Sequence, residues 1–441
     1  MEALHSFVAA HNVMISAILL ILAYIFIATE KIPKVTIALL GGAITVILGL
    51  VSQSKIVDGN VNPLYFVNFV DFNVIFLLVS MMIIVSITTR SGVFSWLANE
   101  LLKLTKGHPI SVLVVLGLFT AVVSAFLDNV TTVILIMPIT FSIAKKLDIN
   151  PIPFLLTEIV ASNIGGTSTL IGDPPNIIIG SAAGFSFMDF IKELTGVVAV
   201  ILFAVIAMLA FCFRKSLKAD PEKMNEITKI DNSSTITDKN LMIRSLIVLS
   251  FVIIGFVLHD MTHIETCIVA MLGASILLLF EKPTEILRDV EWNTIFFFIG
   301  LFIIIGGLEA SGGIKLMAEW VLNVTKGSES ATAMIILWAS GIISGVIDNI
   351  PYTATMSPMI AEIQKVMGQS YAYPLWWCLS LGACLGGNMT IIGAAANVIV
   401  SENAAKEGHP ISFMSFLKYG IPIVFISLAI STAYIYIRFL R

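Results

Sequence analysis

The segment SAFLDNVTTVILIMPI, residues 124–139, is almost wholly apolar, yet it carries Asp128 and Asn129 near its centre. A carboxylate at membrane depth is costly, so such a residue usually faces a polar cavity or a charged partner. An acid in this place therefore either marks a turn at the protein surface or holds something charged inside the protein. The rest of the sequence bears on which interpretation is correct.

The composition predicts a membrane protein. Of the 441 residues, 57% are hydrophobic and 12% are charged, whereas a typical soluble domain has about 25% charged residues. Apolar runs of about 20 residues, long enough to span a bilayer, recur from Val13 to Phe439. The runs are continuously apolar rather than alternating, which excludes a transmembrane β-barrel. We expect an all-α polytopic protein, integral to the lipid bilayer of the plasma (inner) membrane.

Several function classes are excluded by what the sequence contains. The formal net charge is −4, which argues against a nucleic-acid partner. The four cysteines lie in apolar segments without the spacing of metal ligands or of a disulfide framework. The sequence has no HExxH or GxSxG constellation and no nucleotide-binding motif. We therefore expect no enzymatic activity and no cofactor.

The apolar runs predict about ten transmembrane spans. The uninterrupted candidate spans are 13–30, 35–51, 72–90, 194–213, 241–258, 264–280, 292–310 and 415–439. Two interrupted apolar segments lie near 152–185 and 374–405, and paired helices meet at Asp128-Asn129 and at Asp348-Asn349. The polar stretch 214–240 is charged and poor in apolar residues, so we expect a flexible linker there.

The sequence repeats itself across that linker. DFNVIF at Asp71 matches EWNTIF at Glu291, LTKG matches VTKG, and LDNVTT matches IDNIPYT, each pair 220 residues apart. NIGGTSTLIGDPPN (163–176) then aligns with CLGGNMTIIGAAAN (384–397) after one inserted residue. This constant register predicts a gene-doubled protein, with repeats 1–213 and 241–441 on either side of the linker.

The placement of Lys and Arg predicts the orientation of each half. The linker carries six of these residues, so the positive-inside rule makes it cytoplasmic, whereas the 259–265 loop has none and is expected outside. Counting spans then puts Asp71 outside and Glu291 inside, so the two halves cross the membrane in opposite senses. Inverted-topology repeats of this kind are typical of secondary transporters, whose site lies at the repeat interface near the midplane.

Each half has two breaks in its apolar pattern. The first break is the tip of a predicted re-entrant hairpin, near 128–129 in one half and near 348–349 in the other. The second is a glycine-rich stretch, 163–176 or 384–397, that we expect to form an unwound helix. Unwound backbone is tolerated in a membrane only where protein buries it or it lines a cavity. We therefore expect the four breaks to converge on one small polar chamber.

Two interpretations that give these motifs only structural roles compete with this one. Asp128-Asn129 could be a turn between two full spans, because each arm has about 18 residues and would reach about 27 Å as a helix. Close helix packing would explain Gly165 and Gly166, although it does not explain Asp173-Pro174-Pro175-Asn176. The recurrence of the hairpin motif in inverted register favours the re-entrant interpretation.

Glu158 distinguishes the two halves. It lies in FLLTEIVASN, and the equivalent position in the second half is Leu379. An acid present in one half only suggests a role that the halves do not share, so Glu158 is a candidate proton carrier. A buried, hydrogen-bonded structural role is the competing interpretation.

LDNVTT, NIGGTSTLIGDPPN, IDNIPYTATM and ACLGGNMTIIGAAANVIV resemble the arsenite-permease and sodium/proton-antiporter (ArsB/NhaD) group of the ion transporter superfamily. The closest likeness is to its P protein-like branch, with a citrate transporter-like domain. The match covers nearly the whole chain, with four motifs in order. Unlike the related sodium-coupled carboxylate transporters, both hairpin tips carry Asp-Asn rather than Ser-Asn-Thr, which argues against a dicarboxylate substrate.

The resemblance implies a fold and a set of site residues. It implies two re-entrant hairpins, two unwound helices, a dimeric scaffold and a transport domain that moves as an elevator. Asp128, Asn129, Asn163 and Asn176 would line one ion site, and Asp348, Asn349, Asn388 and Asn397 its mate. Both pairs of tip residues would suit Na+. The remaining candidates in the same motifs are Thr131, Thr132, Gly165, Thr167, Asp173, Thr353 and Thr390.

The sequence therefore predicts a secondary active ion transporter, coupled to Na+ or H+ and most simply a cation (Na+)/proton exchanger. Two midplane aspartates that each hold Na+ or H+, but not both, are the minimum device for such exchange. Arsenite or antimonite efflux remains open, because Asn and Thr supply hydrogen bonds to a neutral substrate. An anion or carboxylate carrier, fitted by the helix N-termini at both hairpins, and an ion channel remain open too. We expect a homodimer that forms through the early spans, about 13–51 and 241–280.

The predicted orientation is testable by labelling. The linker should be cytoplasmic and both termini external, so cysteines placed at Ser234 and near Met1 should react with impermeant thiol reagents from opposite faces. Reaction of both positions from the same face would contradict the inverted arrangement.

Overall fold

The computed structural model describes residues 7–29, 31–52, 55–57, 60–62, 64–228, 232 and 235–441. The labelling positions proposed above, Ser234 and the residues next to Met1, lie outside these ranges. Within the described residues, seven helices are long and apolar enough to cross a membrane by length and composition. Five shorter apolar helices accompany them. The prediction of a multi-pass integral membrane protein is confirmed.

The first half is a succession of helices with one small strand pair. Its helices are α2 (Asn12–Thr29), α3 (Lys34–Ile47), η1 (Tyr65–Phe69), α4 (Phe72–Arg90), α5 (Val93–Leu104), α6 (Pro109–Ser124), α7 (Asn129–Leu147), α8 (Ile152–Gly166), α9 (Pro174–Ala183) and α10 (Phe187–Phe213). Between α3 and η1, strands β1 (Lys55–Val57) and β2 (Asn60–Asn62) pair antiparallel, with Lys55 opposite Asn62. This short strand pair leaves the all-α class of the fold unchanged.

The second half follows α11 (Pro221–Thr228). Its helices are α12 (Lys239–Val257), α13 (His259–Thr262), α14 (Thr266–Leu278), α15 (Pro283–Ile286), α16 (Trp292–Ala310), α17 (Gly313–Val324), α18 (Glu329–Ser344), α19 (Asn349–Met367), α20 (Gln369–Gly386), η2 (Ile391–Gly393), α21 (Ala395–Lys406) and α22 (Phe413–Phe439). Helices α4 to α7 have 19, 12, 16 and 19 residues, and α16 to α19 have the same four lengths in the same order.

Two predictions about the polar stretches need correction. The linker is not flexible throughout, because α11 packs against α5 and α7 and Lys223 pairs with Asp148 at 2.6 Å. This hydrogen-bonded ammonium lowers the pKa of the Asp148 carboxyl.

The unwound stretches are also narrower than predicted, because α8 continues to Gly166 and α20 to Gly386. Pro174 and Pro175 begin α9. Proline is tolerated there because the backbone N–H groups of the first helical turn have no partner within the helix.

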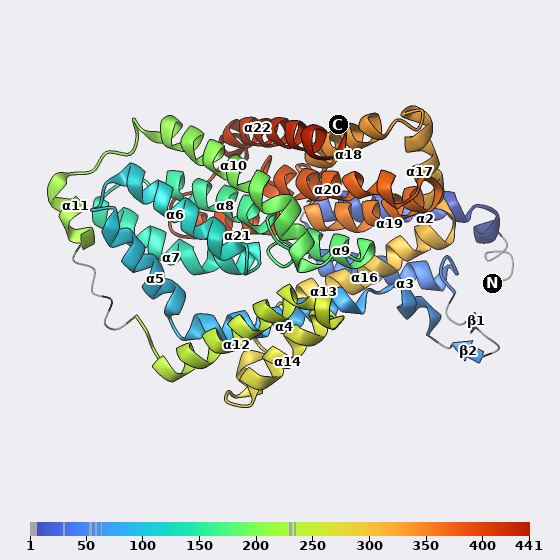
Figure 1. Ribbon diagram of the computed structural model, residues 1–441, viewed down its shortest axis with the longest axis horizontal. Coiled ribbons are helices and arrows are strands. Elements are labelled where there is room, and N and C mark those ends of the chain that lie inside the picture. The colour runs from blue at the N-terminus through green and yellow to red at the C-terminus, as the bar shows by residue number, and fades with distance from the viewer. Residues whose placement is uncertain are drawn as a thin grey trace.

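The helices form two layers. In the support layer, α3 packs along α16, α4 packs against α12 and α14, and α2 joins α3 and α16. The hairpin layer comprises α6–α10 and α18–α22, in which α6 packs on α8 and α18 on α20. Figure 1 shows α4, α12 and α14 along the lower side, with α10 and α22 along the upper side. The same view places α6 and α7 to the left and α18 and α19 to the right.

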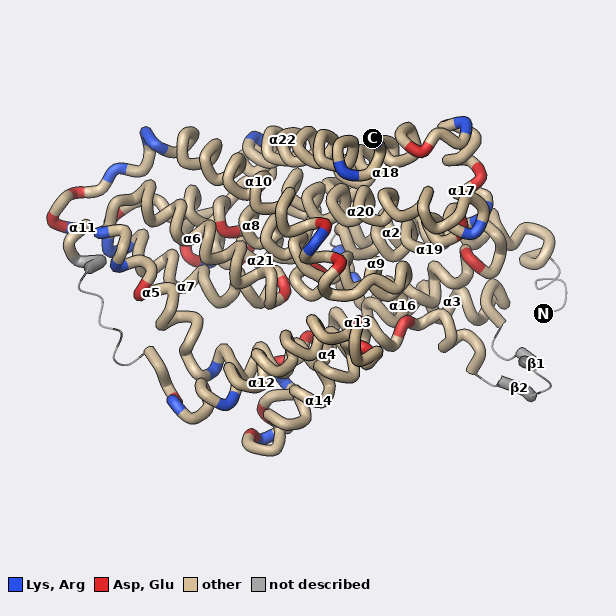
Figure 2. Tube along the Cα trace, viewed as in Figure 1, with Lys and Arg blue, Asp and Glu red and all other residues tan. Residues whose placement is uncertain are grey.

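Basic residues gather at one end of the molecule. Figure 2 shows Lys and Arg around α5, α7 and α11, at the left end of the long axis.

Helices α5 and α17 begin after Gly92 and Gly312, whose left-handed φ values of 81° and 87° turn the chain sharply out of α4 and α16.

Glycine allows the paired helices of the hairpin layer to approach closely. A Cβ on Gly165 would lie 2.2 Å from the Ala121 carbonyl oxygen of α6, and one on Gly386 would lie 2.4 Å from the Gly341 carbonyl oxygen of α18. The two halves therefore use the same backbone-to-backbone contact to hold a hairpin arm against a broken helix.

This contact predicts the effect of Gly165→Ala. In an open helix the change would favour folding by about 1 kcal/mol, but overpacking here should cost about 1–3 kcal/mol instead. Thermal unfolding of the purified protein in detergent should show a lower midpoint. Gly196→Ala in α10 is the matched control, because a Cβ there meets nothing within 4 Å. A Gly165→Ala midpoint as high as that of Gly196→Ala would contradict the close contact.

Candidate ion-binding site

The two hairpin tips are helix N-caps. The Asp128 carboxylate caps α7, accepting from the Thr131 backbone N–H at 2.9 Å and from its hydroxyl at 2.5 Å. The Asp348 carboxylate caps α19, accepting from the Ile350 N–H at 3.1 Å. An N-terminal carboxylate is favoured by the free N–H groups and the dipole of the helix. Each acid is thus held in place by the helix that follows it.

All four breaks line one cavity of about 50 Å³. The residues from the breaks are Asp128, Asn129 and Val130, then Asp173 and Pro174, then Asn349 and Ile350, and finally Ala394, Ala395 and Ala396. The four breaks therefore converge on one small chamber, as predicted, but apolar side chains such as Leu78 and Met82 line it together with the carboxyl and amide groups. Because one hairpin approaches from each end of the molecule, both tips lie in its interior (Figure 1).

The support layer closes this cavity with two residues outside the predicted site. Lys34 at the start of α3 and Glu291 at the start of α16 both line it. The Glu291 carboxylate accepts from the Thr294 hydroxyl at 3.0 Å. The pairing of EWNTIF with DFNVIF marked Glu291 as part of the repeat, but only the packing of α16 beside the tips reveals its place in the site.

Asp173 connects the halves. It is 1% exposed, and its two oxygens accept from the Asn349 amide at 3.4 and 3.3 Å. The unwound stretch of the first half therefore contacts the hairpin tip of the second. Together with Asp128 and Glu291, Asp173 gives the cavity three carboxyl groups.

A second, larger cavity of about 370 Å³ adjoins the first. It is lined by Asp348 and Glu402 among others, and it shares Lys34 and Ala395 with the smaller cavity. Asp348 accepts from the Lys34 ammonium at 3.1 Å. Lys34 therefore stands where the two cavities meet.

The predicted asparagines form a separate buried cluster between the unwound stretches. The Asn163 amide donates to the side-chain oxygens of Asn388 at 2.9 Å and of Asn397 at 3.0 Å. The residues of the two predicted groups therefore interlock across the halves instead of forming two separate sites. All three side chains are fully buried.

Two asparagines hold the unwound backbone in shape. The Asn176 amide donates to the carbonyls of Thr167 at 3.0 Å and Thr169 at 2.8 Å. The Asn397 amide does the same for Gly387 at 2.8 Å and Thr390 at 2.9 Å. Side chains thus satisfy carbonyl groups that the helix no longer pairs.

Hydroxyl groups tie each hairpin to its broken helix in the same way in both halves. Ser124 donates to the Ser162 carbonyl at 2.8 Å, and Ser344 donates to the Ala383 carbonyl at 2.6 Å. Thr390 donates to the Gly345 carbonyl at 2.6 Å, as Thr169 does to the Ala125 carbonyl. Tips and unwound stretches are therefore positioned as one unit.

The remaining predicted residues have mixed roles. The hydroxyls of Thr167 and Thr353 donate to the carbonyls of Asn163 and Asn349, one turn earlier in their own helices. Gly165 permits helix contact and does not line the cavity. The Thr132 hydroxyl, the Asn163 side-chain oxygen and the Asn388 side-chain nitrogen are buried without a hydrogen-bond partner among the described residues. Such groups are available to a bound ion or water.

Glu158 lies away from the cavity, between α8 and α7. It is 1% exposed, one carboxyl oxygen accepts from the Thr140 hydroxyl, and the other has no partner among the described residues. A buried carboxyl with half of its hydrogen-bonding capacity unused is more stable neutral than charged.

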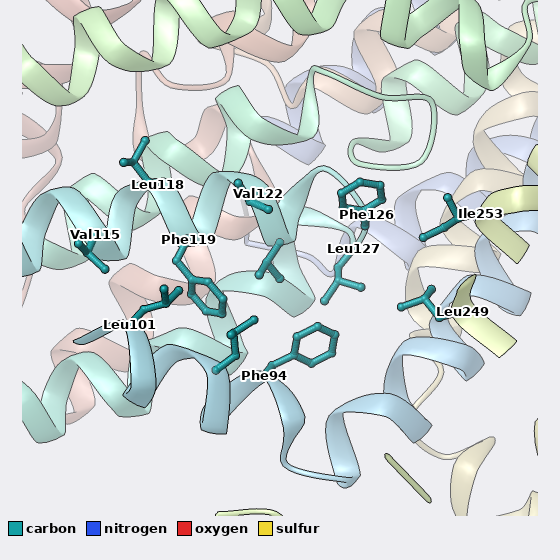
Figure 3. Close-up of a pocket in the computed structure, with 12 residues that line it drawn as sticks. Phe94, Leu101, Val115, Leu118, Phe119, Val122, Phe126, Leu127, Leu249 and Ile253 are labelled. Atoms are coloured by element: carbon teal, nitrogen blue, oxygen red, sulfur yellow. The ribbon is translucent and has the colours of Figure 1, made fainter. Parts of the chain in front are cut away.

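Two large grooves lie apart from this site. A groove of about 500 Å³ between α5, α6 and α12 is lined only by apolar side chains, as Figure 3 shows. A second apolar groove of about 630 Å³ lies between α2, α17 and α18 and uses equivalent positions, such as Val321 for Leu101 and Ile347 for Leu127. Surfaces of this mainly apolar composition suit lipid chains better than an ion.

Comparison with known proteins identifies the family to which the chain belongs. The sequence profile of the family described as citrate transporter matches residues 24–382. The chain is 41% identical to the 46 kDa membrane protein of Mycobacterium leprae, covering 95% of this chain and 97% of that protein. It is 41% identical to a protein of Mycobacterium tuberculosis named as a transporter, covering 96% and 98%.

More distant relatives share the sequence or the fold alone. The P protein of Homo sapiens is 30% identical over 93% of this chain, which spans 58% of that protein. The crystal structure of the YdaH transporter of Alcanivorax borkumensis matches with a TM-score of 0.59, covering 97% of this chain and 98% of that one, at 11% identity. The second likeness concerns the fold only. On the profile and the mycobacterial relatives, the chain belongs to the citrate transporter family and is a membrane transporter.

Proposed function

We propose that the chain is a secondary active exchanger of a small cation, Na+ in the first instance, for protons. The observation that carries this proposal is the convergence of Asp128, Asp173 and Glu291 on a cavity of about 50 Å³, with Asp348 beside it. Carboxylate and amide oxygens are the ligands that hard cations prefer. Carboxyl groups that share a small, buried space cannot all stay charged unless a cation or protons neutralise them.

The size of the cavity supports a small ion. A single water needs roughly 10–15 Å³, so this space holds a few water-sized groups, whereas pockets for drug-sized ligands have about 300–1,000 Å³. A multiply charged anion such as citrate would also be placed against three carboxyl groups. The cavity therefore suits a partly dehydrated cation better than citrate.

A carboxylate carrier is the second candidate. The description of the family favours it, and so do the N-termini of α7 and α19, which both point at the site region. Such a carrier would bind its substrate in the larger cavity, against Lys34, with Na+ in the smaller one. Arsenite efflux and channel activity are distinguished from both by the flux measurements below.

The movement proposed for transport follows from the two layers. The inverted halves bring hairpins α6–α7 and α18–α19 to the site from opposite ends, and hydroxyl contacts join each hairpin to its broken helix. We infer that the hairpin layer slides as a unit against the support layer, which forms the dimer contact. Alternating access around a site at the repeat interface is the general behaviour of inverted-repeat transporters.

The substrate is identified by flux into proteoliposomes. Na+, Li+, arsenite, chloride and citrate are offered separately at several pH values to the purified wild-type protein. The proposal expects Na+ or Li+ movement that is coupled to opposite proton movement. Citrate movement without a cation requirement would favour the second candidate. An ionic current that does not saturate as the ion concentration rises would favour a channel.

Neutralising either tip acid should abolish coupled transport. Asp128→Asn and Asp348→Asn each remove a charge that binds the cation or the proton, while Asn retains the cap of the following helix. Na+-dependent proton flux in proteoliposomes should fall to background although both variants purify as folded protein. Asp71→Asn is the matched control, because Asp71 caps α4 through Asn73 and Val74 and does not line the cavity. Full coupled flux in either tip variant would sink the assignment.

Glu158→Gln should change the pH response and leave cation binding nearly intact. The amide oxygen of Gln keeps the hydrogen bond from Thr140, but the side chain no longer takes up a proton. Calorimetric Na+ titration at two pH values should give different affinities in wild type and similar affinities in the variant. Glu309→Gln in α16 is the control for removing a carboxyl elsewhere. An unchanged pH response in well-folded Glu158→Gln would leave the cavity carboxyls as the only proton carriers.

A further inference from the structure

Lys34 occupies an unusual position for a cation. It is the first residue of α3, where the helix dipole disfavours positive charge, and α3 has no side-chain N-cap to offset it. Its ammonium lies 3.1 Å from an Asp348 oxygen and 5.2 Å from the centre of the Phe297 ring. Its side chain is 33% exposed and that of Asp348 is 10% exposed. The carboxylate of another element, rather than its own helix, stabilises this cation.

The ion pair joins the two layers. Lys34 belongs to α3, which is packed so tightly on α16 that a Cβ on Gly300 would lie 2.4 Å from the Ala38 carbonyl carbon. Asp348 belongs to the tip of the hairpin α18–α19 in the other layer. Any sliding of the hairpin layer along the support layer must therefore break this pair.

When the ion pair breaks, the charge of the Asp348 carboxylate must be neutralised in another way. Without Lys34, Asp348 is a largely buried carboxylate with no cation, and that state is strongly disfavoured. A proton or a metal cation can neutralise the Asp348 carboxylate in place of the Lys34 ammonium. Ion binding and release of the hairpin are thus coupled by one carboxyl group.

We propose that Lys34 is a tethered cation that holds the hairpin α18–α19 until a transported ion takes its place on Asp348. This inference rests on the proposed cation exchange and adds its coupling device. The empty protein stays attached at this contact and does not cycle, so movement in one direction requires an ion for the return. Exchange is then obligatory rather than leaky.

The device is present in one half only. Among the described residues Asp128 has no ion pair, and α14, which takes the place of α3 in the second half, begins with Thr266 instead of a lysine. Lys34 also lines the shared cavity together with Asp128 and Glu291. One lysine therefore serves a site built from both halves.

Transport of the full-length protein in proteoliposomes tests the tether. Radioactive Na+ flux is measured with Na+ on both sides and then with a far-side solution that lacks Na+ and is clamped at alkaline pH, so that neither Na+ nor protons are available for the return step. Wild type should exchange Na+ and show little net flux. Lys34→Gln should gain net flux and bind Na+ about tenfold more tightly, a change within the usual range for coupled sites. Lys34→Arg should behave as wild type, and so should Lys31→Gln, since Lys31 has no ion pair with a described residue.

Hydrogen exchange of the ion-free protein gives a second readout that does not depend on transport. Amides at the start of α19 should be protected in wild type and lose protection in Lys34→Gln, and equally in Asp348→Asn, which breaks the pair from the other side. Addition of Na+ should lower protection in wild type only. These variants keep the inference testable if Lys34→Gln alone fails to fold.

The outcomes separate this inference from the proposed function. If wild type moves no Na+ or protons, the proposed function fails, and loss of tip protection in Lys34→Gln would still establish the tether. If wild type exchanges Na+ but Lys34→Gln shows wild-type coupling, affinity and protection, the tether is overturned and the exchanger stands.

Discussion

A carboxyl group inside a membrane protein must be protonated, paired with a cation or bound to one, and this constraint governs the centre of the molecule. Three such groups share a cavity of about 50 Å³, and Asp348 lies beside it in contact with Lys34. Under the proposed function, a small cation or protons neutralise these groups. The surrounding structure keeps these groups together and keeps lipid away from them.

That surrounding structure is built from interrupted helices whose free backbone groups are satisfied by side chains. Asn176 and Asn397 donate to carbonyls of the unwound stretches, and Ser124 and Ser344 fasten the hairpins to the neighbouring helices. Because both halves use the same contacts, each hairpin and its broken helix behave as one block. A block of this kind can move against the support layer without losing the geometry of its site.

Much of this arrangement could be predicted from the sequence, because apolar length and internal repetition are local signals. The tips at Asp128 and Asp348, and their convergence with the glycine-rich stretches, followed from acids and glycines that interrupt membrane-like segments. Lys34 and Glu291 escaped prediction because each is the terminal residue of an ordinary-looking span, and only the packing of α3 and α16 brings them to the tips. The interlocking of Asn163 with Asn388 and Asn397 depends on contacts across the halves that no local pattern contains.

The central claim is that the site binds a cation in competition with protons. Calorimetric titration of the wild-type protein with Na+, repeated in buffers of different ionisation enthalpy at one pH, measures both events at once. The account predicts saturable Na+ binding whose heat varies with the buffer, because protons are released as the ion enters. Buffer-independent heat, or saturable citrate binding in the absence of any added metal cation together with no response to Na+, would contradict it.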